Sequence, residues 1–451
     1  MNRIRLGANE TILFFMEMII AGIFFLFILT TLRPAFGAVA LFSLLPTYFF
    51  KATVAGIPST FLELSTYALV LGILVRVFFD TELRKQITAR IVWLWSEKRE
   101  FILLIASFLF VVLIFTFVSL DMRRSAGIFK GWFVAPIIAG AAVFFVINKR
   151  TVPWLLALLS TTGAILSAYG LWEYFTFYQD WFKDFHFRLN SVFTSANYLA
   201  LFIGPIISAS LGWLLFSRQV KNNIAPALIL VVTTAVNLVA LFFTFSYGGY
   251  LAVGLSILFL VAALIFTRKN KKFIYITLSM VAVIFAFTFS AVLKSDKFQR
   301  DFLETEGESA LRGRVEVWQT AVYAIKQNPI VGTGLGNFDK VYDKYVRVAI
   351  PNEPLEPNVI LPHNVFLNFW IDTGILGLIM FISVLSYAYI LFSKVKRNFP
   401  YIAYPAAAIL IAIIGHGLVD TSYFKNDLSY LFWLPIALLL YANYETYEQN
   451  R

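Results

Sequence analysis

Residues 363–392 read HNVFLNFWIDTGILGLIMFISVLSYAYILF, a histidine and an asparagine followed by a nearly uninterrupted apolar run. An α-helix needs roughly 20 apolar residues to cross the ~30 Å hydrocarbon core of a membrane. Runs of this length recur along the 451-residue chain, in which 59% of the residues are apolar and 14% are charged. We therefore predict an all-α polytopic membrane protein, with residues 1–451 forming a single membrane domain.

The predicted spans number about twelve. They lie near residues 11–31, 59–79, 101–120, 128–147, 154–174, 193–216, 224–245, 247–267, 273–293, 366–392, 401–419 and 428–444. Lysine and arginine gather in alternate connectors, which places those connectors, and both termini, on the cytoplasmic side. This count requires residues 35–50 to form a partial or re-entrant helix rather than a crossing. Arg123 and Arg124, in a connector assigned to the outside, are the exception to the charge pattern. The net charge of +11 is then explained by topology, so no nucleic-acid partner is expected.

The largest connector, residues 294–365, is mostly polar, and loops of this length are usually functional. We expect it to be extracytoplasmic, to contain short helices and to carry the active site. Within it, apolar residues at helical spacing place Arg314 on the same helix face as Trp318. An arginine on that face needs an anionic partner, and a phosphate is a good geometric match. The alternative is an arginine that extends to the lipid headgroups.

The chain has three histidines, His186, His363 and His416, and the predicted topology places all of them at or near the outer surface. Histidine is the side chain best suited to act as a general base near neutral pH. His363 opens a span at the membrane boundary and is the candidate base, unless it only hydrogen-bonds a helix end. His416 and Asp420, four residues apart, are expected on one helix face, either as a functional pair or as a local structural bond.

Three other patterns limit the function. Gly332, Gly334 and Gly336 superficially suggest a nucleotide-binding loop, but no strand precedes them and no Lys-Ser/Thr follows, so we predict tight turns. The outer loops contain no cluster of metal-ligand residues and the chain has no cysteine, so we expect neither a metal nor a cofactor. Ionisable residues are scarce at mid-membrane depth, which disfavours an ion-driven transporter.

Three segments together resemble the O-antigen ligase and polymerase superfamily. They are GRVEVW (313–318), NPIVGTGLGNF (328–338) and HNVFLNFWIDTGILG (363–377), in this order within and after the largest outer loop. The best match covers residues 237–377. Arg188 with Asn197, and the segment from His416 to Asp420, are similar to further family segments. The resemblance implies a GT-C-type glycosyltransferase in the cytoplasmic membrane, with its active site outside and without nucleotide sugar or metal.

The resemblance also implies substrates and roles. The donor would be a glycan on undecaprenyl diphosphate, with His363 as the base and Arg314 as a diphosphate ligand. The substrate-binding candidates are Arg312, Arg188, Asn364, His416 and Tyr247. Family members commonly have Ser-Arg-Gly where this chain has Ser246-Tyr247-Gly248. Either Arg188 or Arg312 compensates for the missing arginine, or the donor is bound differently.

We favour inverting transfer of a polysaccharide to a surface lipid, in the biosynthesis of lipopolysaccharide or another cell-envelope glycan. The nearest alternative is polymerisation, in which a second lipid-linked repeat is the acceptor, and transfer to protein hydroxyls is a third. A lipid-glycan flippase or transporter would belong to a different class. The long polar loop that ends in His363 favours the enzyme.

Overall fold

The computed structural model describes residues 8–54, 56–177, 188–217, 224–267, 279, 310–350, 354–356 and 358–451. Within these residues nine helical stretches are long and apolar enough to cross a membrane, which confirms the all-α polytopic fold. They are α3 (Phe61–Phe79), α5 (Arg99–Phe117), the stretch Met122–Val146, α8 (Val152–Phe177), α9 (Ala196–Phe216), α10 (Ile224–Phe243), α11 (Tyr247–Thr267), α16 (Val365–Val395) and α17 (Pro400–Gly417). The predicted span 273–293 lies outside the described residues except for Ser279, and residues 294–309 and His186 lie outside them entirely.

The remaining elements are shorter or less apolar. They are α1 (Ala8–Leu32), α2 (Pro34–Ser43), the 3-10 helix η1 (Leu45–Phe49), the hairpin β1–β2 (Lys51–Val54 and Ile57–Thr60), α4 (Thr81–Glu97), α14 (Ala310–Gln327), α15 (Phe338–Ala349) and α18 (Asn426–Asn450). The stretch Met122–Val146 consists of α6 (Met122–Ile128), a π-helical turn η2 (Phe129–Val134) and α7 (Ala135–Val146). Helix α18 is buried from Asp427 to Tyr444 and contacts α7, α16 and α17. Its last residues, 445–450, are mostly polar and partly or fully exposed, which makes the helix as a whole less apolar.

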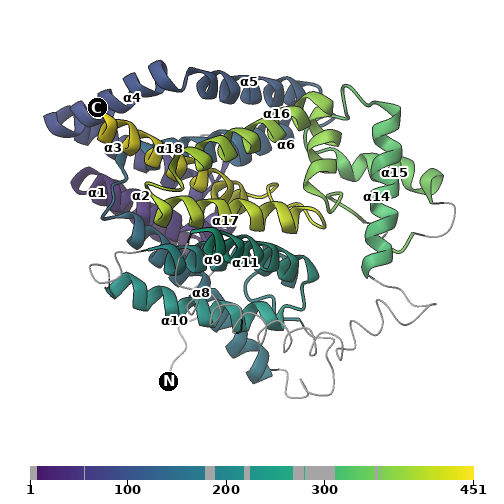
Figure 1. Cartoon of the computed structure of the whole chain (residues 1–451). Coiled ribbons are helices and arrows are strands. Elements are labelled where there is room, and N and C mark those ends of the chain that lie inside the picture. Colours follow the sequence, from purple (N-terminus) through teal and green to yellow (C-terminus); the bar gives the residue numbers. More distant parts are fainter. Residues whose placement is uncertain are drawn as a thin grey trace.

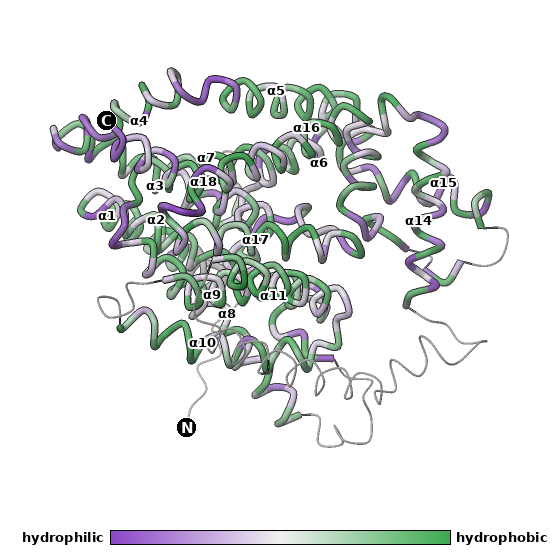
Figure 2. Tube along the Cα trace, in the orientation of Figure 1, coloured by the Kyte–Doolittle hydropathy of each residue, from purple (hydrophilic) through white to green (hydrophobic). Residues whose placement is uncertain are grey.

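Most helices run side by side, and α14 and α15 stand at one end of this bundle (Figure 1). We call that end the loop end; it contains the connectors 118–121, 188–195, 244–246 and 418–425. The opposite end contains the connectors 147–151 and 396–399. Helices of the bundle are mainly hydrophobic along their length, whereas α4 and the α14–α15 region carry more hydrophilic residues (Figure 2). The polar connector therefore forms a separate layer over one end of an apolar bundle.

The first three helices differ from the predicted topology. Gly22 of α1 packs against the Phe61 ring at the start of α3, and Thr30, further along α1, packs against Gly72, further along α3. Helices α1 and α3 therefore run parallel, and the expectation that the first two predicted spans cross in opposite directions is wrong. The return path is formed by α2 and η1, residues 34–49, and so by most of the segment 35–50 that was expected not to cross. The cytoplasmic placement of the N-terminus depended on that expectation and no longer follows.

Contacts along α2 and η1 trace this return. Gly37 packs against Thr30, and the Ser43 carbonyl oxygen accepts a hydrogen bond from the Thr162 hydroxyl at 2.9 Å in the middle of α8. The rings of Tyr48 and Phe49 then lie near Lys425 at the loop end. A ten-residue helix spans only ~15 Å, so α2 needs the additional length of η1 to reach the loop end.

Glycines hold the segment after α14 against a kink in α16. Gly332, Gly334 and Gly336 all have positive φ, as does Gly374 at the kink. A Cβ at Gly374 would collide with the Ile330 carbonyl oxygen, and a Cβ at Gly332 with the Ile371 carbonyl oxygen. The Thr333 amide donates to that same Ile371 oxygen at 2.7 Å. The predicted tight turns are confirmed.

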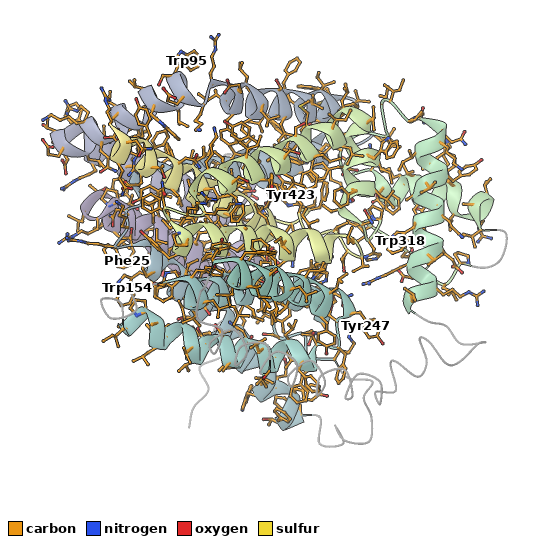
Figure 3. All side chains as sticks on the ribbon, in the orientation of Figure 1. Phe25, Trp95, Trp154, Tyr247, Trp318 and Tyr423 are labelled. Carbon is orange, nitrogen blue, oxygen red and sulfur yellow. The ribbon has the colours of Figure 1, made fainter. Side chains whose placement is uncertain are left out.

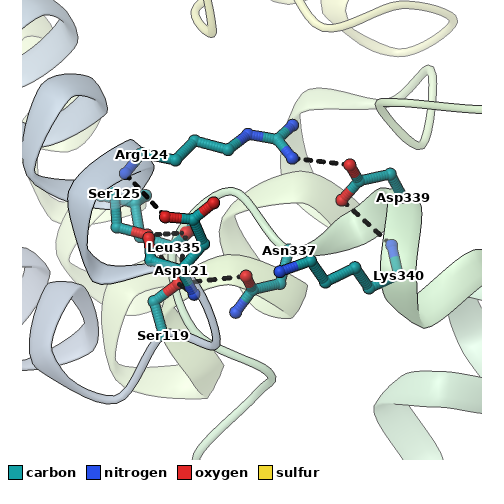
Figure 4. Close-up of polar contacts among 8 residues, drawn as sticks. All are labelled: Ser119, Asp121, Arg124, Ser125, Leu335, Asn337, Asp339 and Lys340. Carbon is teal, nitrogen blue, oxygen red and sulfur yellow. Dashed lines mark hydrogen bonds and ion pairs between the residues drawn. The ribbon is translucent and has the colours of Figure 1, made fainter.

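A second attachment joins α15 to α6 (Figure 4). Arg124 forms an ion pair with Asp339 at 2.6 Å, and the Ser119 hydroxyl donates to the Asn337 side-chain oxygen at 3.0 Å. Arg124 was one of the two basic residues that broke the predicted charge pattern. The ion pair with Asp339 explains why a basic residue is found at the loop end.

Candidate active site

Helix α14 presents Arg314 and Trp318 to the bundle, as the predicted helical stripe required. The Trp318 indole N–H donates to the His363 carbonyl oxygen at 3.1 Å, and Arg314 Nη2 lies 3.5 Å from Asp420 Oδ2. Figure 3 shows Trp318 on the side of α14 that faces the bundle. Arg312 is two residues from Arg314, about 200° around the helix. Its side chain is 57% exposed and lies 3.7 Å from Glu316, so α14 does not direct both arginines to one point.

His363 lies between two carboxylates. Its Nδ1 is 3.3 Å from Asp420 Oδ1, and its Nε2 is 3.7 Å from Glu356 Oε2. The imidazole is 29% exposed, so a substrate can reach it. The backbone at His363 has a φ of 46°, a left-handed conformation that costs a non-glycine residue on the order of 1–3 kcal/mol and is typical of functional sites.

Asn364 fixes the position of His363. Its side-chain oxygen accepts from the amides of Phe366 and Leu367 at 3.0 and 3.1 Å and so caps α16. Its side-chain nitrogen donates to the Leu418 carbonyl oxygen at 2.9 Å. These bonds join the start of α16 to the connector that carries Asp420. They give Asn364 a positioning role, whereas its predicted substrate-binding role is not tested by any contact.

Asp420 contacts both His363 and Arg314. Its side chain is 5% exposed, and burial alone would raise its pKa. The hydrogen bond and charge of His363 and the charge of Arg314 outweigh this effect and hold the pKa of Asp420 well below its ordinary value. An ionised carboxylate only accepts hydrogen bonds, so His363 Nδ1 carries the proton. The charged imidazole is protonated on Nε2 as well, and only the neutral form has a lone pair there, on the nitrogen that faces away from Asp420.

The expected pairing of His416 with Asp420 on one helix face is wrong. Helix α17 ends at Gly417, so Asp420 lies beyond the helix and contacts His363 and Arg314 instead. His416 is buried against Gly248, where an added Cβ would come within 2.6 Å of the imidazole Nε2. Neither ring nitrogen of His416 has a hydrogen-bond partner among the residues described. His416 therefore lies beside the Asp420 cluster without bonding to it.

Arg188 and Tyr247 also lie at the loop end. Arg188 donates to the Thr244 carbonyl oxygen at 2.8 Å and to the Asn197 side-chain oxygen at 2.6 Å. Arg188 and Asn197, which together resemble a family segment, are thus in direct contact. Tyr247 begins α11 at the end of the bundle next to α14 (Figure 3). These residues border the site, and their predicted roles in substrate binding remain predictions.

The sequence reasoning missed the central role of Asp420 and did not identify Glu356. Asp420 was noted only as a possible partner of His416, four residues before it. The signal that could have corrected this is the Gly417-Leu418 pair, since glycine often ends a helix. Glu356 lies in irregular structure 7 residues before His363, and no periodic pattern connects the two.

A family model described as O-antigen ligase matches residues 228–382. This stretch contains α10, α11, α14, α15 and the first half of α16, and it includes Arg314, Glu356 and His363. Residues 228–382 are thus similar to O-antigen ligases, and we call them the matched region. The resemblance to the O-antigen ligase superfamily is thereby confirmed over this region. Arg188, His416 and Asp420 lie outside the matched region, so the site combines this region with the helices before and after it.

Two curated relatives are both named O-antigen ligase. The protein from Pseudomonas aeruginosa is 29% identical over 129 residues, which cover 28% of this chain and 29% of the relative. The protein from Salmonella typhimurium is 30% identical over 171 residues, which cover 37% of this chain and 39% of the relative. Each match spans well under half the length of the relative.

Proposed function

We propose that this multi-pass membrane protein is a glycosyltransferase that transfers a polysaccharide from undecaprenyl diphosphate to a hydroxyl group of a surface lipid. The observation that carries the proposal is the arrangement of His363 and Arg314 on the two oxygens of one buried carboxylate, Asp420. The similarity of residues 228–382, which include both His363 and Arg314, to O-antigen ligases supports the same chemistry. The reaction would take place at the outer face of the cytoplasmic membrane, so the loop end would face outward.

The proposed reaction is a single displacement. His363 Nε2 takes the proton of the acceptor hydroxyl while the hydroxyl oxygen attacks the anomeric carbon of the donor sugar. The bond between that carbon and the diphosphate oxygen breaks, and its electron pair leaves with the diphosphate. Attack from the side opposite the leaving group inverts the anomeric configuration. Asp420 stabilises the imidazolium that forms, in the manner of an orienting carboxylate.

Arg314 would stabilise the charge that develops on the leaving diphosphate. Its contact with Asp420 is long, at 3.5 Å, and its side chain is 17% exposed. A guanidinium carries five N–H donors, so donors remain for phosphate oxygens. The charge of Arg314 replaces the need for a metal ion in this step, which is why we propose a metal-independent reaction.

The position of the site suits a lipid-linked donor. Arg314 lies on α14 and contacts Asp420 in the connector 418–425, and His363 lies two residues before α16. The α14–α15 region carries more hydrophilic residues than the helices of the bundle (Figure 2). The carrier chain can remain in the membrane while the glycan extends into water. An active site within the bundle would exclude a large glycan, and one at the outer surface of α15 would be far from the lipid phosphates.

The experiment is reconstitution of the full chain with a defined lipid-diphosphate glycan, offered either a lipid acceptor or a second copy of the repeat. Transfer of a whole block to the lipid acceptor supports ligation, whereas stepwise growth of the glycan indicates polymerisation. His363→Asn should reduce transfer by about 10²–10⁴-fold while donor binding is retained. Undiminished transfer by this variant would contradict the base assignment, and no transfer by the unaltered protein to either acceptor would contradict the function.

A further inference from the structure

Lys425 ends the connector that carries Asp420, and four aromatic rings surround its ammonium group. The rings come from η1, from the segment before α9 and from α9 itself. Their centroids lie 4.1 to 5.9 Å from Lys425 Nζ and belong to Tyr198, Phe193, Tyr48 and Phe49. We call these four residues the ring cage. Three separate segments of the chain thus meet around one lysine at the loop end.

The ring cage positions the ammonium without neutralising it. Aromatic faces attract a cation, and most strongly where water is excluded. Among the residues described, the Lys425 ammonium has no hydrogen bond or ion pair, although an ammonium can donate three hydrogen bonds. The residue as a whole is partly buried. An oriented cation with unused donors is suited to bind an anion.

Two acids face Lys425, and neither forms an ion pair with it. Burial lowers the pKa of Lys425, whereas the charges of Asp427 and Asp420 raise it. Asp427 lies on the first turn of α18 and is fully buried. Asp420 is the carboxylate already held by His363 and Arg314. The charge of Asp420 thus acts on Lys425, and Arg314 contacts the same carboxylate at 3.5 Å.

We propose that Lys425 is a second phosphate-binding cation, which acts with Arg314 on the diphosphate of the lipid-linked donor. The inference rests on the proposed function, because a diphosphate presents two anionic groups to two separated cations. An ammonium binds phosphate as a compact point charge, and a guanidinium binds it through a planar fork. Tyr247 cannot supply this second charge, since a phenol near neutral pH is uncharged.

The alternative role for Lys425 is structural, as a counter-charge to buried Asp427. A structural role predicts that a variant without the charge is less stable. Its affinity for all ligands should then fall by the same factor. A phosphate-binding role predicts loss of the preference for a diphosphate over a monophosphate. The test therefore measures selectivity between two lipids that differ by one phosphate.

The full-length protein in lipid nanodiscs is titrated with undecaprenyl diphosphate, undecaprenyl phosphate and inorganic pyrophosphate. The unaltered protein should bind the lipid diphosphate more tightly than the lipid monophosphate. Lys425→Met preserves chain length and the apolar contacts with the rings, and it should lower this preference by about tenfold or more. Lys425→Arg keeps the charge and should retain the preference. Lys396→Met is the matched control, since Lys396 also lies over a ring, Phe392, but at the opposite end of the bundle.

Phe193→Leu gives a second measurement should Lys425→Met fail to fold. It keeps the cation, removes one ring of the cage and should lower the preference by a smaller factor. Unchanged preference in the Lys425→Met or Phe193→Leu protein, or equal weakening of both lipids, would overturn the assignment. So would an effect confined to inorganic pyrophosphate, since the ligand would then be a soluble anion. No preference for the diphosphate in the unaltered protein would overturn the proposed donor as well, which distinguishes the two failures.

Discussion

Asp420→Asn is the substitution that tests the site most directly, because it removes one charge and keeps the shape of the side chain. The Asp420 carboxylate is 5% exposed, and its two oxygens lie 3.3 Å from His363 Nδ1 and 3.5 Å from Arg314 Nη2. A hydrogen bond to a charged group contributes about 1.5–3 kcal/mol. If that energy is lost in the transition state, the rate of glycan transfer should fall by roughly 10–150-fold.

The same substitution should alter stability in a pH-dependent way. The pKa of Asp420 is lowered in the folded protein, so its stabilisation is present above its ordinary pKa and is lost as the pH falls through the folded value. The difference in unfolding free energy between the two proteins should therefore shrink as the pH falls below about 4. Thermal unfolding of the two reconstituted proteins at several pH values measures this difference in unfolding free energy.

Asp339→Asn is the matched control, since Asp339 also pairs with an arginine in the polar layer but lies at the α6 contact. It should leave the rate of transfer nearly unchanged. A normal rate and a normal pH dependence in the Asp420→Asn protein would refute the reasoning that Asp420 orients His363. A loss of equal size in the Asp339→Asn protein would show that any weakening of the loop has the same effect.

Three further outcomes are expected. Arg314→Ala should weaken binding of the lipid-diphosphate donor by about tenfold or more, and unchanged affinity in a binding titration would argue for a role at the membrane interface alone. Gly374→Ala should destabilise the fold by about 1–3 kcal/mol in thermal unfolding, because its φ is positive and the Ile330 carbonyl oxygen occupies the added methyl position. Gly254→Ala, with open space around it, should not destabilise, and equal melting of the two variants would contradict the argument. Chelators should leave transfer intact, whereas a strict divalent-metal requirement would contradict the proposed reaction.

The helical spans were predictable because length and apolar composition alone decide whether a helix can cross a membrane. The path of residues 34–49 was not, since a short interrupted helix is compatible with either a crossing or a return. Charge counts cannot resolve that choice when the N-terminal segment carries few charges. Thr30 and Gly72, which pack against each other, are far apart in the sequence. No local sequence pattern predicts this contact.

The candidate site could be predicted in part from local sequence patterns. Helical spacing placed Arg314 and Trp318 on one face, and the order of segments identified His363. Asp420 was assigned to the wrong histidine because the α17 pattern does not reveal that the helix ends at Gly417. The ring cage of Lys425 draws on η1, α9 and the segment between them, so its members share no periodicity.

Helix α14 is fastened to α16 at two places. The Trp318 indole N–H donates a hydrogen bond to the His363 carbonyl oxygen, just before α16 begins. The Trp370 indole N–H, within α16, donates to the carbonyl oxygen of Pro329, just after α14 ends, at 2.8 Å. The spacing between Arg314 and His363 is therefore set by two indole contacts and not by the chain that connects them. The connection between them, residues 328–362, can therefore differ in length without changing that spacing, provided that the two indole contacts are kept.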